Sequence, residues 1–128
     1  MKQTSIIKVH TGYCHKNMLK DLEALRYYYP ELESINIGQS VLGRSIPAVR
    51  LGTGPNQLHY NGSIHANEWI TTLLLMVFIE KYLEANRNDS SMDGIYIPEL
   101  FRNKSLWIVP MVNPDGVDLV QNGFTADN

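Results

Sequence analysis

Apolar and polar positions along the chain change their spacing from one segment to the next. Residues 15–28 predict a helix, because apolar side chains recur there every three to four positions. They form one stripe: Leu19, Leu22, Leu25 and Tyr29. Pro30 ends the helix, and His15 at its start is expected to be exposed.

Two short extended segments follow, over residues 34–40 and 45–51. Gly43 lies in the turn between them, so the simplest pairing is an antiparallel hairpin. Pro47 has no backbone N–H to donate within the second segment. It therefore indicates an edge position or a bulge.

Residues 57–64 predict the next strand, and a helix is expected from residue 67 or 68 to residue 85. The first three turns of this helix are apolar on nearly all sides. Such a helix is expected to be buried between other elements.

The last third of the chain predicts a helical turn over residues 95–102 and a strand over 105–112. The strand is almost continuously apolar, which is typical of a central strand covered on both faces. Residues 113–116 read Asn-Pro-Asp-Gly and favour a type I turn, whereas residues 117–128 are weakly patterned. Strands interleaved with helices indicate an α/β fold.

Composition narrows the class of protein. The chain has 128 residues, 44% of them hydrophobic and 19% charged, which suits one globular domain. Its net charge is -2 and no Lys/Arg cluster stands out, so a nucleic-acid partner is not expected. No apolar run is long enough to cross a membrane. The start lacks the apolar core of a signal peptide, so a natural N-terminus at Met1 predicts a cytoplasmic protein.

His65 and Glu68 are the strongest candidates for chemistry. They stand three residues apart, after the glycine-containing turn at Gly62 and before the apolar helix. An imidazole nitrogen and a carboxylate are both zinc ligands, and catalytic zinc sites use three protein ligands and a water. The alternative is a solvated helix start, in which the helix dipole favours Glu68 in the first turn.

Three stretches, taken together, resemble the zinc carboxypeptidases of the carboxypeptidase A type. They are residues 37–44 (Ile-Gly-Gln-Ser-x-x-Gly-Arg), His65–Trp69 (His-Ala-Asn-Glu-Trp) and residues 112–116 (Val-Asn-Pro-Asp-Gly). Their order and separations also match the family. The resemblance covers essentially the whole chain, and the His-Ala-Asn-Glu-Trp variant is most similar to bacterial γ-D-glutamyl-diamino-acid endopeptidases.

The resemblance implies that His65 and Glu68 are the first two ligands of one zinc ion. The third family ligand is a histidine, and no histidine follows His65, so this ligand is expected beyond residue 128. Asn67 stands where many members carry an arginine that contacts substrate. The charged guanidinium group, which can form two parallel hydrogen bonds to a carboxylate, is therefore absent from this position. The general base and the other catalytic groups are also expected beyond residue 128, so no catalytic residue is assigned within this chain.

The resemblance also implies an architecture: a mixed, twisted sheet flanked by helices, of which residues 1–128 form the incomplete N-terminal portion of a single zinc peptidase catalytic domain. The parent would hydrolyse peptide or peptidoglycan-peptide substrates, with the 128-residue chain inactive by itself. A truncated sheet would leave an edge of residues 105–112 unpaired and one side of residues 73–79 uncovered. Self-association through this edge is therefore expected.

Two other classes of function stay open at this stage. A family relative could keep the scaffold and bind peptides or a partner without catalysis. An α/β domain of unrelated function could carry His65 and Glu68 as ordinary surface residues. The zinc content of the full-length protein separates the peptidase from both alternatives.

Overall fold

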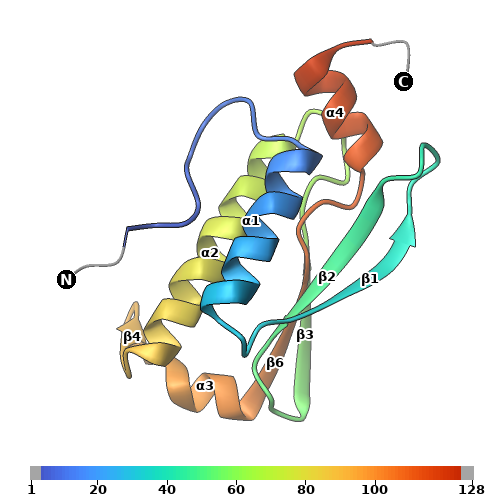
Figure 1. Cartoon of the computed structure of the whole chain (residues 1–128). Helices are drawn as coiled ribbons and strands as arrows, with labels where there is room; N and C mark the ends of the chain where they lie inside the picture. The colour runs from blue at the N-terminus through green and yellow to red at the C-terminus, as the bar shows by residue number, and fades with distance from the viewer. Residues whose placement is uncertain (1–3, 125–128) are drawn as a thin grey trace.

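The computed structural model describes residues 4–124 and confirms an α/β fold built on a mixed sheet (Figure 1). A four-stranded sheet has the order β1-β2-β6-β3, and β4 and β5 form a separate two-stranded hairpin. The elements in chain order are α1 His15–Tyr28, β1 Glu33–Gln39, β2 Ser45–Leu51, β3 Asn56–Asn61, α2 Trp69–Arg87, β4 Ser91–Met92, β5 Ile95–Tyr96, α3 Ile97–Asn103, β6 Lys104–Val109 and α4 Pro114–Asn122.

The pairing of the strands follows from their connections. β1 and β2 are joined by a short turn and pair antiparallel, as the sequence predicts. β3 and β6 pair parallel, because α2 and α3 lie between them in the chain and allow a crossover. β2 pairs antiparallel with β6, so the sheet is mixed.

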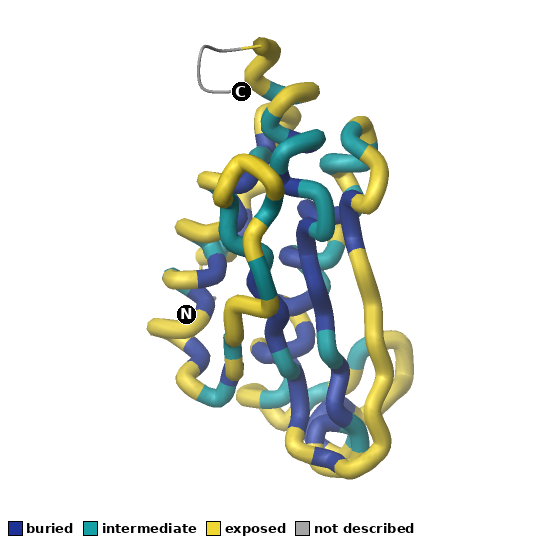
Figure 2. Tube along the Cα trace, turned by 90° about the vertical axis from the view of Figure 1, so that its right-hand side faces the viewer, coloured by how far each residue is buried: buried dark blue, intermediate teal, exposed yellow. Residues whose placement is uncertain are grey.

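The core lies between the sheet and two long helices. α1 and α2 run side by side over one face of the sheet (Figure 1). Leu106 and Ile108 of β6 are buried in this core, whereas Trp107 is half-buried on the opposite face, under the guanidinium of Arg50. Figure 2 shows the buried residues concentrated in the middle strands and on the sides of the helices that face them.

Two expectations for α1 are wrong. The buried stripe begins at Met18 rather than Leu19, which is 37% exposed, and it continues through Leu22 and Leu25. His15 is buried rather than exposed, because it packs against the hairpin, where its Nε2 lies 2.8 Å from the carbonyl oxygen of Ser45. The helix start therefore packs against the hairpin instead of facing solvent.

Pro47 lies in an interior strand, and the bulge is the feature that accommodates it. The register between β1 and β2 shifts between Asn36 and Gly38, opposite Pro47. The pairing of β2 with β6 extends only over Val49–Leu51, so it does not reach Pro47. The missing N–H therefore removes no bond of the β2–β6 ladder.

Residues 113–116 begin a helix instead of forming an isolated turn. Asn113 is the N-cap of α4, and its Oδ1 accepts a hydrogen bond of 3.0 Å from the N–H of Gly116. Pro114 occupies the first helical position, where the absent N–H has no consequence. Turn-forming residues and helix-capping residues are the same types, so the sequence pattern did not separate the two outcomes.

The edge strands of the sheet are β1 and β3, so the expectation of an unpaired edge at residues 105–112 is wrong. β6 pairs with β2 on one side and with β3 on the other, whereas β3 is exposed along its whole length. The structure does show the expected uncovered side of α2, where Ile70 is 59% and Leu74 is 67% exposed. α2 thus leaves one side uncovered, contrary to the expectation that it is buried between other elements on all sides.

Candidate metal centre

The candidate site lies at the edge of the sheet where β3 and β6 both end. The strands are parallel, so the chain leaves both at the same edge. The Gly62 N–H donates to the carbonyl of Val109 over 3.0 Å, and the Val112 N–H donates to the carbonyl of Gly62 over 2.9 Å. A Cβ on Gly62 would stand 2.5 Å from the carbonyl oxygen of Pro110, so only glycine permits this approach.

The structure brings His65 and Glu68 together at this edge. The Nδ1 atom of His65 lies 2.8 Å from Oε1 of Glu68. Their side chains are 75% and 43% exposed, so both ligand atoms are open to solvent. Glu68 is the N-cap of α2, and its N–H bonds to the carbonyl of His65 over 3.0 Å, which folds the loop so that the two side chains converge.

Glu68 has the electrostatics of a ligand carboxylate. The hydrogen bond with the His65 ring, and a second one from the His65 N–H, lower the pKa of Glu68 below its ordinary value. Glu68 is therefore ionised at neutral pH, as a zinc ligand must be.

The pair fits a zinc ion in donor type and separation. Zinc bonds to histidine nitrogen and carboxylate oxygen are about 2.0 to 2.2 Å long, so two ligand atoms at a tetrahedral angle stand about 3.3 Å apart. The observed 2.8 Å separation requires an opening of only about 0.5 Å. Within residues 4–124, no group of three or more His, Cys, Asp or Glu side chains that could hold a metal is present.

Asn67 lies between the two ligand candidates in the loop, and its side chain is exposed. An amide offers hydrogen-bond donors and an acceptor without charge. Its place beside His65 and Glu68 suits contact with a ligand that approaches the pair from solvent.

Asn113 fastens the start of α4 to the loop that carries the pair. Its N–H donates to the carbonyl of Ser63 over 2.9 Å, and its Nδ2 donates to the carbonyl of Ile64 over 3.3 Å. The loop is thereby bonded to the segment that follows β6.

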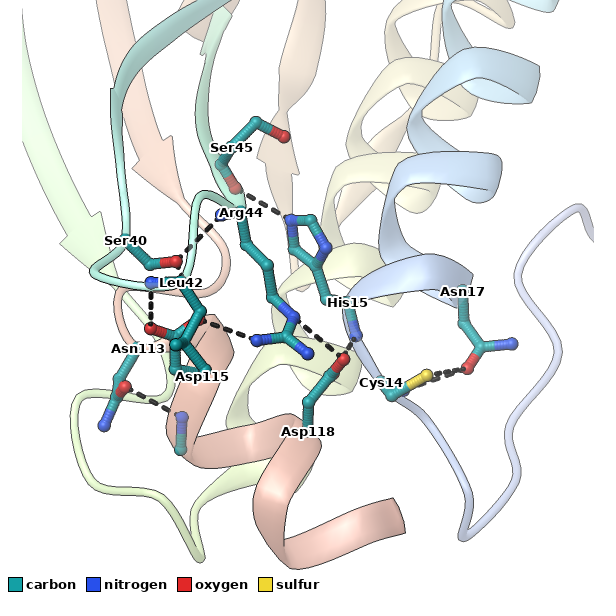
Figure 3. Close-up of polar contacts among 11 residues, drawn as sticks. Cys14, His15, Asn17, Ser40, Leu42, Arg44, Ser45, Asn113, Asp115 and Asp118 are labelled. Carbon is teal, nitrogen blue, oxygen red and sulfur yellow. Dashed lines mark hydrogen bonds and ion pairs between the residues drawn. The ribbon is translucent and has the colours of Figure 1, made fainter. Parts of the chain in front are cut away.

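A clamp of charged and polar groups holds α4 against the hairpin (Figure 3). Arg44 reaches from the hairpin to Asp115 over 2.9 Å and to Asp118 over 3.1 Å. Ser40 donates to Asp115 over 2.6 Å, and the backbone N–H of His15 donates to Asp118 over 3.1 Å. The clamp joins the hairpin, α1 and α4, and so it supports the loop indirectly.

The clamp changes the protonation of its members. Burial raises the pKa of Asp115, but hydrogen bonds from Ser40 and Arg44 outweigh burial and hold it below the ordinary value. The hydrogen bond to Asp115 raises the pKa of Arg44. In the sequence, Arg44 is visible only as the last residue of the motif at residues 37–44. The three-residue spacing of Asp115 and Asp118, which puts both on one helix face, was the signal that could have found its partners.

The helices of residues 4–124 include none that is both long and apolar enough to cross a membrane.

Comparison with known proteins gives a consistent result. The model of the family described as zinc carboxypeptidase matches residues 18–128. The chain is 42% identical over 122 residues to gamma-D-glutamyl-L-diamino acid endopeptidase 1 of Lysinibacillus sphaericus, covering 95% of this chain and 31% of the relative. It is 35% identical over 118 residues to metallocarboxypeptidase A of Arthroderma otae, covering 88% and 26%.

A solved structure shares the fold. Bovine thrombin-activatable fibrinolysis inhibitor, in complex with tick carboxypeptidase inhibitor, superposes with a TM-score of 0.72 at 22% identity, over 86% of this chain and 34% of that chain. The chain thus spans about a third or less of the length of each of these three proteins.

Proposed function

The chain belongs to the zinc carboxypeptidase family, and on this premise we propose that His65 and Glu68 are two ligands of a zinc ion in a peptidase. The observation that carries the proposal is the 2.8 Å approach of His65 Nδ1 to Glu68 Oε1 on an open loop. A zinc ion held by His65 and Glu68 would supply polarisation of a peptide carbonyl and activation of a water molecule.

The residues of this chain supply the binding part of the mechanism. Ionised Glu68 contributes a negative charge that offsets part of the charge of the ion. His65 Nδ1 and Glu68 Oε1, now 2.8 Å apart, would hold the ion, and His65 would bind it through an unprotonated Nδ1. The third ligand, a histidine, and the general base are proposed to come from residues other than these 128.

The proposed substrate is a peptidoglycan peptide, cut at a γ-D-glutamyl-diamino-acid bond. Support comes from the name of the 42% identical relative, a gamma-D-glutamyl-L-diamino acid endopeptidase. Asn67 adds physical support, because an exposed amide between the ligands cannot pair with a carboxylate as a guanidinium does. Asn67 is proposed to contact the substrate through hydrogen bonds.

A peptide-binding module without catalysis is the second candidate. The observation in its favour is that the open His65, Asn67 and Glu68 side chains lie on one loop, where they can bind a peptide through hydrogen bonds. The same loop and the same exposed Asn67 would then recognise a peptide alone.

Hydrolysis by the full-length protein tests the proposal. We expect a γ-D-glutamyl-diaminopimelyl peptide to be cut, with activity lost on chelation and in Glu68→Gln. Glu84→Gln, which changes an exposed glutamate on α2, serves as the matched control and should keep full activity. Zinc binding without hydrolysis would favour the binding module, and absence of zinc from the full-length protein would contradict the proposal. The 128-residue chain alone is expected to show no turnover.

A further inference from the structure

Beneath the ligand loop lies a cluster of three hydroxyl groups, from Ser63, Thr71 and Thr72. Ser63 is 1% exposed and Thr72 is fully buried. Ser63 Oγ lies 2.6 Å from Thr72 Oγ1, which in turn lies 2.6 Å from the carbonyl oxygen of Pro110. The cluster thereby joins the end of β3 to the first turn of α2 and to the end of β6.

The backbone of Ser63 is held in an uncommon conformation two residues before His65. Its φ is 50°, in the left-handed region that costs free energy for residues other than glycine. Its N–H donates to Thr71 Oγ1 over 2.8 Å, and its carbonyl accepts from the Asn113 N–H over 2.9 Å. Strain of this kind persists only where surrounding contacts hold it.

The same cluster holds the backbone of Glu68. The hydroxyls of Ser63 and Thr71 each lie 2.8 Å from the carbonyl oxygen of Glu68. One buried group of hydroxyls is therefore bonded on both sides of the loop, next to each of the two ligand candidates.

The protons of Ser63 and Thr72 cannot satisfy every acceptor at once. Carbonyl oxygens only accept, so Thr72 donates either to Pro110 or to Ser63. In the first arrangement, the Thr72 hydroxyl donates to the Pro110 carbonyl, the Ser63 hydroxyl donates to Thr72, and the Thr71 hydroxyl donates to the Glu68 carbonyl. In the second, the Ser63 hydroxyl donates to the Glu68 carbonyl and the Thr72 hydroxyl donates to Ser63. Both arrangements need the Ser63 and Thr72 hydroxyls together, so the two residues act as a unit.

We propose that Ser63 and Thr72 are positioning residues that set the separation of His65 Nδ1 and Glu68 Oε1. They do not touch the proposed ion, and they act through the backbone on each side of the loop. The part of this inference that concerns zinc rests on the proposed function, whereas the part that concerns the His65–Glu68 contact does not.

Zinc titration of the 128-residue chain, followed by NMR of the His65 ring, tests the inference. Thr72→Val removes the hydroxyl at nearly constant shape, and we expect zinc affinity to fall about tenfold, as is typical when a group behind a metal ligand is lost. Thr72→Ser keeps the hydroxyl and should restore the affinity. Ser63→Gly should also bind zinc more weakly, although glycine adopts a φ of 50° without strain.

Ser105→Ala is the matched control. Ser105 is fully buried and donates to the carbonyl of Gly54 over 2.6 Å, at the opposite end of β6 from the loop. This variant loses a comparable buried hydrogen bond, yet zinc affinity should stay as in the unmodified chain.

A metal-free measurement separates this inference from the proposed function. The nuclear Overhauser contact between the His65 ring and the Glu68 side chain should weaken in Thr72→Val and persist in Thr72→Ser and Ser105→Ala. If the full-length protein binds no zinc, the proposed function fails, and the His65–Glu68 contact still decides the positioning role. A folded Thr72→Val or Ser63→Gly chain with an unchanged His65–Glu68 contact would overturn the inference.

Discussion

A Cβ atom on Gly116 would lie 2.8 Å from the Cβ of Ala66, so α4 begins directly against the loop of the candidate metal centre. The same atom would lie 2.5 Å from Nδ2 of the capping residue Asn113. Gly116→Ala is therefore expected to lower the free energy of unfolding by about 1 to 3 kcal/mol, since Ala66 and Asn113 would have to move to accept the methyl group. Urea denaturation measures the loss.

Gly38→Ala is the control for this prediction. Nothing stands within 4 Å of a Cβ at Gly38, so its effect should stay within about 0.5 kcal/mol. Equal stability of Gly116→Ala and Gly38→Ala would mean that α4 does not pack closely against the loop.

The Arg44–Asp115 contact predicts sensitivity to acid. The pKa of Asp115 is lower in the folded chain than the unfolded value of about 3.9, so its contribution to stability is complete above that value. The contribution is lost as the pH falls through the folded-state pKa. Asp115→Asn should therefore cost about 1 to 2 kcal/mol at pH 7 and should flatten the decline of stability below pH of about 4.

Thermal unfolding between neutral and acidic pH checks this result. Asp93→Asn is the control, because Asp93 is exposed and asparagine tolerates its positive φ of 50°. An acid profile of Asp115→Asn that is parallel to that of the unmodified chain would show that the clamp carries no charge-dependent stability.

The clamp also shows why part of the fold could not be read from the sequence. The order of strand, glycine turn, ligand pair and helix is local, because the alternation of residues 57–64 and the His-x-x-Glu spacing lie in adjacent residues. The burial of His15 depends on Ser45 and Asp118, which are distant in the chain. Local spacing carries no information about such partners.

The order of the strands in the sheet is the second feature that could not be predicted from the sequence. The apolar run at residues 105–112 correctly predicted a central strand, but the neighbours of that strand depend on how the crossover through α2 and α3 returns. The open edge at β3 therefore lies one strand away from the edge expected at residues 105–112. At the candidate site, the loop and the approach of His65 to Glu68 were predictable, whereas the buried Ser63–Thr72 contact required the tertiary fold.

Tyr82 and Tyr13 make a matched pair for a test of buried hydroxyls. Within residues 4–124, the Tyr82 hydroxyl is buried without a hydrogen-bond partner, whereas the Tyr13 hydroxyl donates to Asp21 over 2.8 Å. Tyr82→Phe is expected to keep or raise stability, by up to about 2 kcal/mol, and Tyr13→Phe should cost about 1 to 3 kcal/mol.

Urea denaturation measures the free energy of unfolding of Tyr82→Phe and Tyr13→Phe and so tests these two expectations. Burial raises the pKa of Tyr82 to about 12, which ultraviolet titration of the phenol can check independently. Equal losses in the two variants would show that the Tyr82 hydroxyl has a partner.

The β3 edge predicts self-association of the 128-residue chain. β3 contains no Lys, Arg, Asp, Glu or Pro, the residues that usually keep sheet edges from pairing. Leu58 and Tyr60 of β3 are 45% and 48% exposed, beside the 67% exposed Leu74 of α2. Exposed apolar surface next to an unpaired edge favours association between chains.

Sedimentation velocity over a range of concentrations measures this association. Leu58→Lys should reduce it, whereas Ile35→Lys on β1, at the opposite edge of the sheet, should reduce it less. A concentration-independent monomer that binds no apolar dye would contradict the prediction.

The most direct test of the metal centre is a zinc titration of the full-length protein with observation of the ring nitrogens of its histidines by NMR. The account predicts that zinc shifts Nδ1 of His65, that His10, His15 and His59 are unaffected at the same concentration, and that Glu68→Ala abolishes the shift. A titration in which His65 Nδ1 does not respond, or responds equally in Glu68→Ala, would contradict the assignment of these two residues as zinc ligands.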